Sequence, residues 1–174
     1  MDAKRLSRSI VYSGRVFRIE RDLVRLPNGR KAPMEIVRHR GSVVLVPQPD
    51  RRHVILIRQY RYAIDRWIWE LPAGSLEPGE APRLAARREC AEEIGLEPRR
   101  MTRLAAYYPT PGFCDEFMTF YRCERLAAPK GPVARDPDEQ IEPRVFSLAE
   151  ARHLIERGRI IDMKTVIGVS LIER

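Results

Sequence analysis

Alternating apolar and polar positions in the first forty residues predict β-strands. Residues 9–13 and 16–26 alternate imperfectly, and a further run, 32–38, follows a Pro27-Asn28-Gly29 turn. Because these turn residues favour a tight chain reversal, the pattern predicts an antiparallel hairpin. We expect this segment to form a small N-terminal β extension.

Two short runs rich in β-branched residues follow, and they lack alternation. The runs are SVVLVP at 42–47 and HVILIRQ at 53–59. Continuous apolar runs of this length are typical of strands that are buried on both faces, so both are predicted as central strands of a buried sheet. Further on, a helix is predicted over 81–94, with Pro82 in its first turn and Gly95 at its C-terminal end.

The second half of the chain mixes predicted strands with predicted helices. The expected strands are 102–108, 116–122 and 142–146. A capping box from Ser147 to Glu150 predicts a helix that runs to about residue 157, and a last helix is expected at 163–172. The whole pattern, which has no internal repeat, predicts an α+β domain over 41–174 preceded by the β extension at 1–40.

The composition is that of a folded protein and excludes several classes. Of the 174 residues, 44% are hydrophobic and 32% are charged, which argues against a disordered chain. No apolar run approaches the ~20 residues that span a bilayer, and the basic N-terminus lacks the apolar core of a signal peptide. Three cysteines without CxxC spacing argue against a disulfide framework or a zinc site, so the reducing cytoplasm is the expected location.

The net charge of +8 permits nucleic-acid binding but does not favour it. Only four of the 32 basic residues are lysines, and the arginines are spread along the chain without a dense block. Nucleic-acid surfaces need basic side chains clustered on one face. We therefore expect a solvated arginine-rich surface or an attraction for small anions.

Three carboxylates share one side of the helix predicted over 81–94. At ~100° per residue, Glu89, Glu92 and Glu93 fall on an arc about 100° wide. The side expected to face a core carries Leu84, Ala91 and Ile94. Carboxylates at these spacings repel one another, and a hard cation such as Mg²⁺ offsets the repulsion. The neighbouring Arg88 can hold one carboxylate with its guanidinium fork.

The stretch 74–96 has a fixed spacing of glycine, arginine and glutamate. It runs from Gly74 through five residues to Glu80, then through seven residues to Arg88-Glu89, Cys90, Ala91, Glu92-Glu93, Ile94, Gly95 and Leu96. This spacing resembles the box of the Nudix hydrolases, which act on nucleoside diphosphates linked to another moiety. The resemblance implies an α+β Nudix fold, an α/β/α sandwich around a mixed sheet. It makes Gly74, Glu80, Arg88 and Gly95 structural residues of the box.

Runs on both sides of the box resemble the ADP-ribose pyrophosphatase branch. They are RQYR at 58–61, WELPAG at 69–74, PTPGFCDE at 109–116 and GRIIDMKTVIGVSLI at 158–172. Pro111 lies fifteen residues after Leu96, about where that branch carries its marker proline. The resemblance implies hydrolysis of ADP-ribose or a related ADP-sugar to AMP and a sugar phosphate, with Mg²⁺ as cofactor and Mn²⁺ as its substitute.

Two alternative functions stay open at this point. A GDP-mannose or broad nucleotide-sugar pyrophosphatase is the nearer one, because close relatives with similar flanking runs cleave other nucleotide sugars. A non-catalytic ADP-ribose sensor is the other, and it predicts a damaged box, whereas the box here is intact.

The resemblance also assigns metal and diphosphate contacts. The backbone carbonyl of Ala73 and the carboxylates of Glu89 and Glu93 are expected to ligate the metal. Glu92 is expected to bind a second ion or to orient the attacking water. Arg61 is expected to contact the diphosphate, where a bidentate guanidinium serves better than lysine.

The catalytic base of this branch usually lies on a late acidic loop, here residues 136–142. Glu139 aligns best with the glutamate of that loop, and Glu116 is the alternative. Pro137 stands where some relatives place their proposed base, so the identity of the base stays open.

Substrate contacts are expected outside the helix as well. Glu77, Pro111 and Gly112 are assigned to substrate binding. In the family an N-terminal β extension forms the adenine clamp, often across a dimer, so Tyr12 and Phe17 are candidates. The resemblance therefore predicts a homodimer that binds a small nucleotide sugar, with neither membrane nor nucleic acid as a partner.

Overall fold

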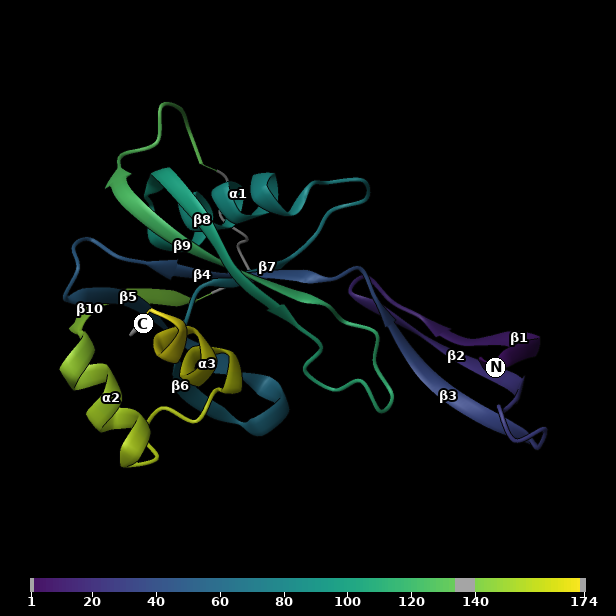
Figure 1. Ribbon diagram of the computed structural model, residues 1–174. Coiled ribbons are helices and arrows are strands. Elements are labelled where there is room, and N and C mark those ends of the chain that lie inside the picture. The colour runs from purple at the N-terminus through teal and green to yellow at the C-terminus, as the bar shows by residue number, and fades with distance from the viewer. Residues whose placement is uncertain (1, 134–139, 173–174) are drawn as a thin grey trace. The chain divides into compact units, whose positions relative to one another are not determined.

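Three antiparallel strands form a sheet from the N-terminal residues. They are β1 (Lys4–Ser13), β2 (Phe17–Arg25) and β3 (Lys31–His39), in the order β1-β2-β3 (Figure 1). The predicted reversal between β2 and β3 is confirmed, and β1 begins five residues earlier than expected. The register of β1 against β2 shifts between Ile10 and Tyr12, which leaves Val11 without a direct partner. Such a bulge increases the local twist of a strand.

The computed structural model describes residues 2–133 and 140–172, and the chain divides into two compact units. Met1–Gly41 and Tyr107–Met118 form the first unit, and Ser42–Ala106 and Thr119–Arg174 form the second. Within the first unit the segment Tyr107–Met118 contains a loop that pairs with β3. The amide of Val37 donates a hydrogen bond to the carbonyl of Phe113 at 2.7 Å. No local sequence pattern indicated this pairing, since Val37 and Phe113 are 76 residues apart in the chain.

Ion pairs support the centre of the first sheet. Glu20 and Asp22 on β2 are buried, and arginines from all three strands surround them. The Nε atoms of Arg18 and Arg38 each lie 2.8 Å from a Glu20 oxygen, and Arg8 Nε lies 3.2 Å from Glu20 Oε2. Charged side chains thus take the place of an apolar core on this face of the sheet.

The second unit contains two further sheets. The first has the strand order β7-β4-β9-β8, and the second β10-β5-β6. Their bounds are β4 (Ser42–Pro47), β5 (His53–Arg61), β6 (Arg66–Glu70), β7 (Ala73–Ser75), β8 (Glu97–Tyr107), β9 (Met118–Ala127) and β10 (Ile141–Ser147). The sequence placed β4 and β5 together in one buried sheet, whereas each belongs to a different sheet.

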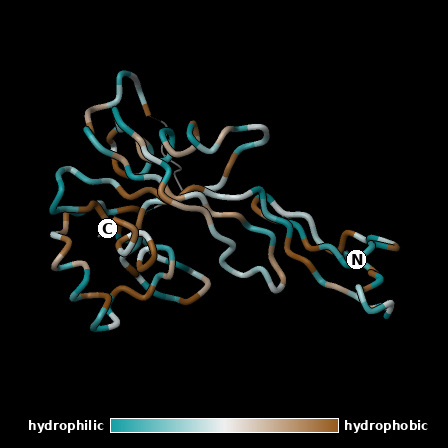
Figure 2. Tube along the Cα trace, in the orientation of Figure 1, coloured by the Kyte–Doolittle hydropathy of each residue, from teal (hydrophilic) through white to brown (hydrophobic). Residues whose placement is uncertain are grey.

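Strand β4 is buried on both faces, which explains its unbroken apolar run. Val43 and Leu45 belong to the core cluster of helix α1 (Pro82–Ile94). Val44 and Val46 alternate with them and face the other side, where α3 (Met163–Leu171) packs on β4. Figure 1 shows the two helices on opposite sides of β4, and Figure 2 shows the apolar stretches of these strands.

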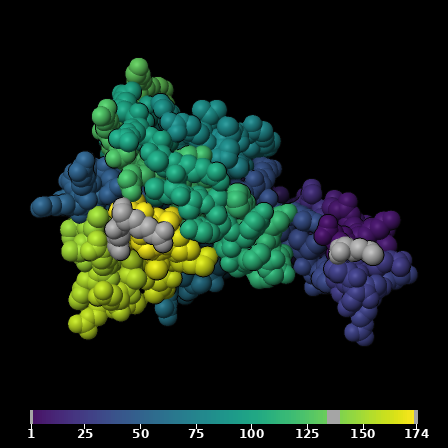
Figure 3. All heavy atoms as spheres, viewed as in Figure 1, coloured from purple at the N-terminus to yellow at the C-terminus, as the bar shows by residue number. Residues whose placement is uncertain are grey.

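The helices begin and end close to the predicted residues. Gly95 ends α1 in the left-handed conformation, with φ of 70°, which favours glycine. The predicted capping box is confirmed, because Ser147 Oγ accepts a hydrogen bond from the Glu150 amide at 3.0 Å and starts α2 (Leu148–Glu156). Helix α2 lies on the surface of its unit (Figure 3). No helix in the described part of the chain is long and apolar enough to cross a bilayer.

The structure contains short elements that the pattern did not predict. The 3-10 turn η1 (Tyr62–Ile64) separates β5 from β6, and β6 and β7 are built from the WIWELPAG stretch. Strand β7 pairs with β4 through only three residue pairs, Ser42 with Ser75, Val43 with Gly74 and Val44 with Ala73. A strand this short gives little periodic signal, yet it provides the backbone of the candidate site.

Candidate active site

Two carboxylates of α1 meet the backbone of β7. Glu93 Oε2 accepts a hydrogen bond from the Ala73 amide at 3.0 Å. A Cβ atom at Gly74 would lie 2.0 Å from the carboxylate carbon of Glu89, so only glycine permits this approach. Glu89 and Glu93 are 9% and 5% exposed, which makes them the buried members of the predicted carboxylate cluster.

Arg88 connects this helix to the preceding loop. Its Nε and Nη2 atoms donate to the two oxygens of Glu80 at 3.1 and 2.9 Å, and Nη1 donates to Glu89 at 2.7 Å and to Glu92 at 3.0 Å. The hydrogen bonds from Arg88 lower the pKa of Glu80, and those carboxylates raise the pKa of Arg88. One guanidinium thereby contacts three carboxylates and holds the loop in place.

The third helix carboxylate and the loop glutamate are more accessible. The Glu92 side chain is half-buried and points to Arg88. Glu77 is exposed, and its backbone amide donates to Glu80 Oε2 at 3.0 Å. Both residues therefore lie beside the same arginine-centred network as Glu89.

The donor set is suited to a hard divalent cation. No three His, Cys, Asp or Glu side chains converge on one point among the described residues, so there is no all-protein cage in that part of the chain. Mg²⁺ does not require such a cage, because it is usually bound by one or two carboxylates together with substrate phosphates and water. Glu89 and Glu93, both directed to the β7 backbone, fit that requirement.

A second charged network lies around Glu70, the glutamate of the WELPAG run. Arg61 Nε and Nη2 each donate to a Glu70 oxygen at 2.6 Å, and Lys164 also donates to this carboxylate. Lys164 Nζ lies 3.1 Å from Asp162 as well. The hydrogen bonds to Glu70 raise the pKa of Arg61, and the charge of Glu93 adds to this effect.

This network adds partners of Arg61 that the sequence did not predict. The sequence assigned Arg61 to the diphosphate, and the structure shows two of its nitrogens directed to Glu70. Its third nitrogen, Nη1, forms no hydrogen bond or ion pair within the described part of the chain. Sequence reasoning did not identify Glu70 and Lys164, and the only signal for them was their position inside the WELPAG and C-terminal runs.

The residues that α1 buries differ in part from those that the helical projection predicted. Leu84 was expected in the core and is 62% exposed, so that expectation is wrong. Ala85, Ala86 and Cys90 fill the core side together with Ile94. The small residues allow α1 to lie close to β4, whereas Leu84 lies on the exposed side of the helix.

The first unit contains Pro111, Gly112 and Glu116. Pro111 and Gly112 are exposed in the loop that pairs with β3. Glu116 Oε1 lies 3.8 Å from His39 Nδ1, a nitrogen that accepts a hydrogen bond from the Gly41 amide. Glu139, the other candidate base, lies outside the described residues.

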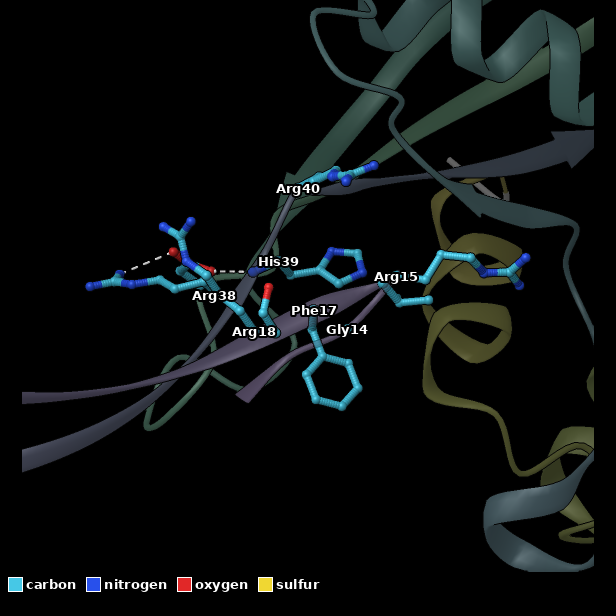
Figure 4. A pocket seen from close by; sticks show the side chains of 10 residues that line it. Gly14, Arg15, Phe17, Arg18, Arg38, His39 and Arg40 are labelled. Carbon is cyan, nitrogen blue, oxygen red and sulfur yellow. Dashed lines mark hydrogen bonds and ion pairs between the residues drawn. The ribbon is translucent and has the colours of Figure 1, made fainter. Parts of the chain in front are cut away.

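Tyr12 and Phe17 form an aromatic pair beside the β1–β2 turn. Their ring centroids are 5.9 Å apart, and both side chains are exposed. Phe17 also lines a cavity of about 280 Å³ within the first unit (Figure 4). The lining includes Arg15, Arg18, Arg38, His39 and Arg40. No sequence pattern indicated this basic cavity, although the run RHR at 38–40 supplies two of its four arginines.

Comparisons with known proteins identify relatives of the chain along nearly its whole length. Residues 37–165 match the family model described as NUDIX domain. The chain is 37% identical over 172 residues to the methanol dehydrogenase activator of Bacillus methanolicus, with 99% of this chain and 93% of the relative covered. It is 33% identical over 173 residues to the ADP-ribose pyrophosphatase of Bacillus subtilis (strain 168), with 99% and 94% covered. A crystal structure of an ADP compounds hydrolase superposes with a TM-score of 0.84 at 24% identity, over 99% of this chain and 93% of that one, and so supports the fold.

Proposed function

The chain belongs to the Nudix hydrolase family, and we propose that it cleaves the pyrophosphate bond of ADP-ribose or a related ADP-sugar to give AMP and a sugar phosphate. The observation that carries the proposal is the approach of Glu89 and Glu93 to the β7 backbone at Gly74. Full-length similarity to ADP-ribose pyrophosphatases supports the choice of substrate.

Nudix hydrolases generally use divalent metal ions, and we propose Mg²⁺ here, with Mn²⁺ as a substitute. Glu89, Glu93 and the carbonyl of Ala73 would hold the ion, and Glu92 would hold a second ion or orient the water. When bound, the ion polarises a phosphoryl oxygen and lowers the pKa of a coordinated water. Arg88 orients Glu89 and Glu92, because its Nη1 atom donates to both.

The chain's own residues would bind the diphosphate and move the proton. Arg61, fixed by Glu70, would present its remaining Nη1 edge to a phosphoryl oxygen. We assign the general base to Glu139 or Glu116. Glu77 is assigned to substrate binding, and its position beside the network of Arg88 supports this role.

The N-terminal extension is proposed to complete the site of a second copy of the chain. Tyr12 and Phe17 would clamp the adenine, and Pro111 and Gly112 would line the same substrate pocket. Two copies would then form a homodimer. The apolar side chains that the first unit exposes support this assembly, since they need a surface to pack against: Ile10, Val11, Tyr12, Val16 and Phe17.

We also propose a cytoplasmic location. Cys90, Cys114 and Cys123 are all free thiols, and two of them are buried. Structural disulfides are rare in reducing compartments, so three free cysteines agree with the cytoplasm.

A panel of nucleoside diphosphate sugars tests the proposed function. ADP-ribose, ADP-glucose and GDP-mannose are incubated with the protein and Mg²⁺, and the products are resolved by chromatography. We expect ADP-ribose to give AMP and ribose 5-phosphate with the highest kcat/KM. A preference for GDP-mannose would contradict the proposal that the enzyme selects adenine nucleotides. Turnover of no member of the panel would contradict the activity itself. Full turnover in excess EDTA would contradict the metal requirement.

A further inference from the structure

A second cavity, of about 610 Å³, lies in the second unit beyond the end of β4. The catalytic carboxylates meet β7 where Ala73 pairs with Val44, near the start of β4. The cavity begins at Gln48, four residues further along, which corresponds to roughly 13 Å of extended chain. The two sites therefore lie at opposite ends of this strand.

The cavity opens on the face of the sheet that is turned away from α1. Tyr121 and Cys123 of β9 point into the core cluster that contains α1 residues. Side chains alternate along a strand, so Arg122 and Glu124 point to the other face. Ile172, directly after α3, lines the cavity with them.

Arginines dominate the lining, and its two carboxylates are already engaged. Glu124 lies 3.5 Å from Arg100 Nε. Asp50 accepts a hydrogen bond from the Arg52 amide at 2.7 Å and contacts His53. The three remaining arginines of the lining form no ion pair with any carboxylate among the described residues: Arg51, Arg122 and Arg125.

One buried polar group in this lining lacks a partner. Arg122 Nε is buried and has no hydrogen-bond acceptor within the described part of the chain. A buried donor without an acceptor destabilises the folded protein, and it does so more strongly when it carries charge. An anion seated in the cavity would remove that destabilisation.

The backbone next to Arg122 is also unusual. Arg125 has φ of 54°, one of only two such values at non-glycine residues in the described chain. Strained conformations of this kind cluster at ligand-binding sites, because a ligand can offset them. Here the strained residue lines the same cavity as the unpaired guanidinium.

We propose that this cavity is a second ligand site, separate from the catalytic centre, that binds a phosphate-bearing anion. Guanidinium groups bind phosphate oxygens in a bidentate manner, and three arginines without carboxylate partners provide this chemistry. No aromatic ring lines the cavity, so it has no surface on which a base could stack. The phosphate group is therefore what the site recognises, either free or as a phosphate monoester. The proposal does not depend on the reaction that the chain catalyses.

Calorimetric titration in EDTA tests the site, because excluding metal weakens anion binding at the catalytic centre. Inorganic phosphate, ribose 5-phosphate and AMP are titrated separately into the full-length protein. We expect at least one of them to bind with one equivalent per chain, and the tightest binder to identify the source of the phosphate. Arg122→Gln and Arg125→Gln should each raise its dissociation constant about tenfold or more.

Two controls separate this site from the alternatives. Glu93→Gln alters the catalytic centre and should leave the dissociation constant unchanged. Arg103→Gln removes the same charge from β8 outside the lining and should also have no effect. Circular dichroism shows whether Arg122→Gln folds. If it does not, Arg51→Gln and Arg125→Gln still test the lining, because both positions are exposed. The proposal is overturned if none of the three anions binds, if the lining variants bind normally, or if Glu93→Gln or Arg103→Gln abolishes binding.

Discussion

The guanidinium of Arg61 and the carboxylate of Glu70 form a two-point hydrogen-bonded pair, with both donor–acceptor distances at 2.6 Å. Glu70 is buried, and Lys164 is its second cationic partner. Arg61 is therefore held from the protein side, and its Nη1 edge is the part available to a substrate. Fixing a guanidinium in advance reduces the entropy lost when it binds a phosphate.

Arg61→Lys should reduce kcat/KM for ADP-ribose by about tenfold to a hundredfold, although the charge is conserved. Lysine has no planar fork, so it cannot bind both oxygens of Glu70 and still reach the diphosphate. Steady-state kinetics at saturating Mg²⁺ measure the effect. Arg66→Lys is the matched control, since Arg66 pairs with Arg61 across β5 and β6 but is exposed. Equal kinetics for both variants would show that Arg61 does not contact the substrate.

Stability should depend on pH through Glu70. Burial alone would raise the pKa of Glu70, but Arg61 and Lys164 outweigh burial and lower it below the ordinary value of 4.5. A lowered pKa stabilises the folded state above pH 4.5, and this contribution is lost as the pH falls through the pKa of the folded state. Urea unfolding at pH values from 7 to 3 measures the effect. Below pH 4.5 the free energy of unfolding of the wild type should fall relative to that of Glu70→Gln. Glu156→Gln, on the exposed face of α2, should follow wild type throughout.

Local sequence signals predicted the elements of the fold better than their partners. The caps at Ser147 and Gly95 and the apolar run of β4 depend on neighbouring residues, and all three appear where the pattern placed them. Pairing between β3 and the loop at 107–118 depends on residues far apart in the chain, which periodicity does not record. The split of β4 and β5 into two sheets was missed for the same reason.

For the site, sequence spacing located the carboxylates but not their environment. The helical projection placed Glu89 and Glu93 on one side of α1, and both are directed to β7. It could not show that Glu70 and Lys164 hold Arg61, because that network joins three separate elements. It also could not show that Leu84 is exposed, since a helix without its neighbours has no defined buried side.

Glu93→Gln should reduce kcat about a hundredfold or more and weaken the dependence of the rate on Mg²⁺. An amide oxygen carries no net charge and is a poorer ligand for a hard cation than a carboxylate. Rates measured over a range of Mg²⁺ concentrations will separate loss of metal affinity from loss of turnover. Glu156→Gln removes one carboxylate on α2 and should change neither quantity. A folded Glu93→Gln protein with the kcat of wild type would exclude Glu93 as a ligand.

Gly74→Ala should lower kcat by about a hundredfold with little loss of stability outside the site. The added Cβ would lie 2.0 Å from the Glu89 carboxylate, so Glu89 must move away from β7. Displacements of about 1 Å at a reacting group can cost roughly that factor in rate. Gly131→Ala is the control, because a Cβ there meets no atom within 4 Å. The same kcat for both alanine variants would mean that the position of Glu89 is not critical.

Subunit mixing should restore activity if the N-terminal sheet of one chain completes the site of another. Phe17→Ala removes the proposed clamp, and Glu93→Gln removes a proposed metal ligand, so each variant alone should be nearly inactive. A mixed dimer would contain one intact site, with Phe17 from one chain and Glu93 from the other. Random exchange of subunits should therefore recover about one quarter of the wild-type activity.

The controls for this experiment separate complementation from simple addition. Glu89→Gln mixed with Glu93→Gln should recover nothing, because both changes affect the same half of every site. Deleting residues 1–38 leaves 136 of the 174 residues, so light scattering should show a monomer lighter than the 20.2 kDa of the full chain, with weakened affinity for ADP-ribose. Light scattering first establishes whether the wild-type protein is a dimer. If it is, and a mixture of Phe17→Ala and Glu93→Gln is no more active than the sum of its parts, the whole site lies within one chain. The exposed apolar side chains of the first unit are the reason to expect a partner copy. A wild-type protein that scatters as a monomer and retains full activity would therefore exclude both the dimer and the shared site.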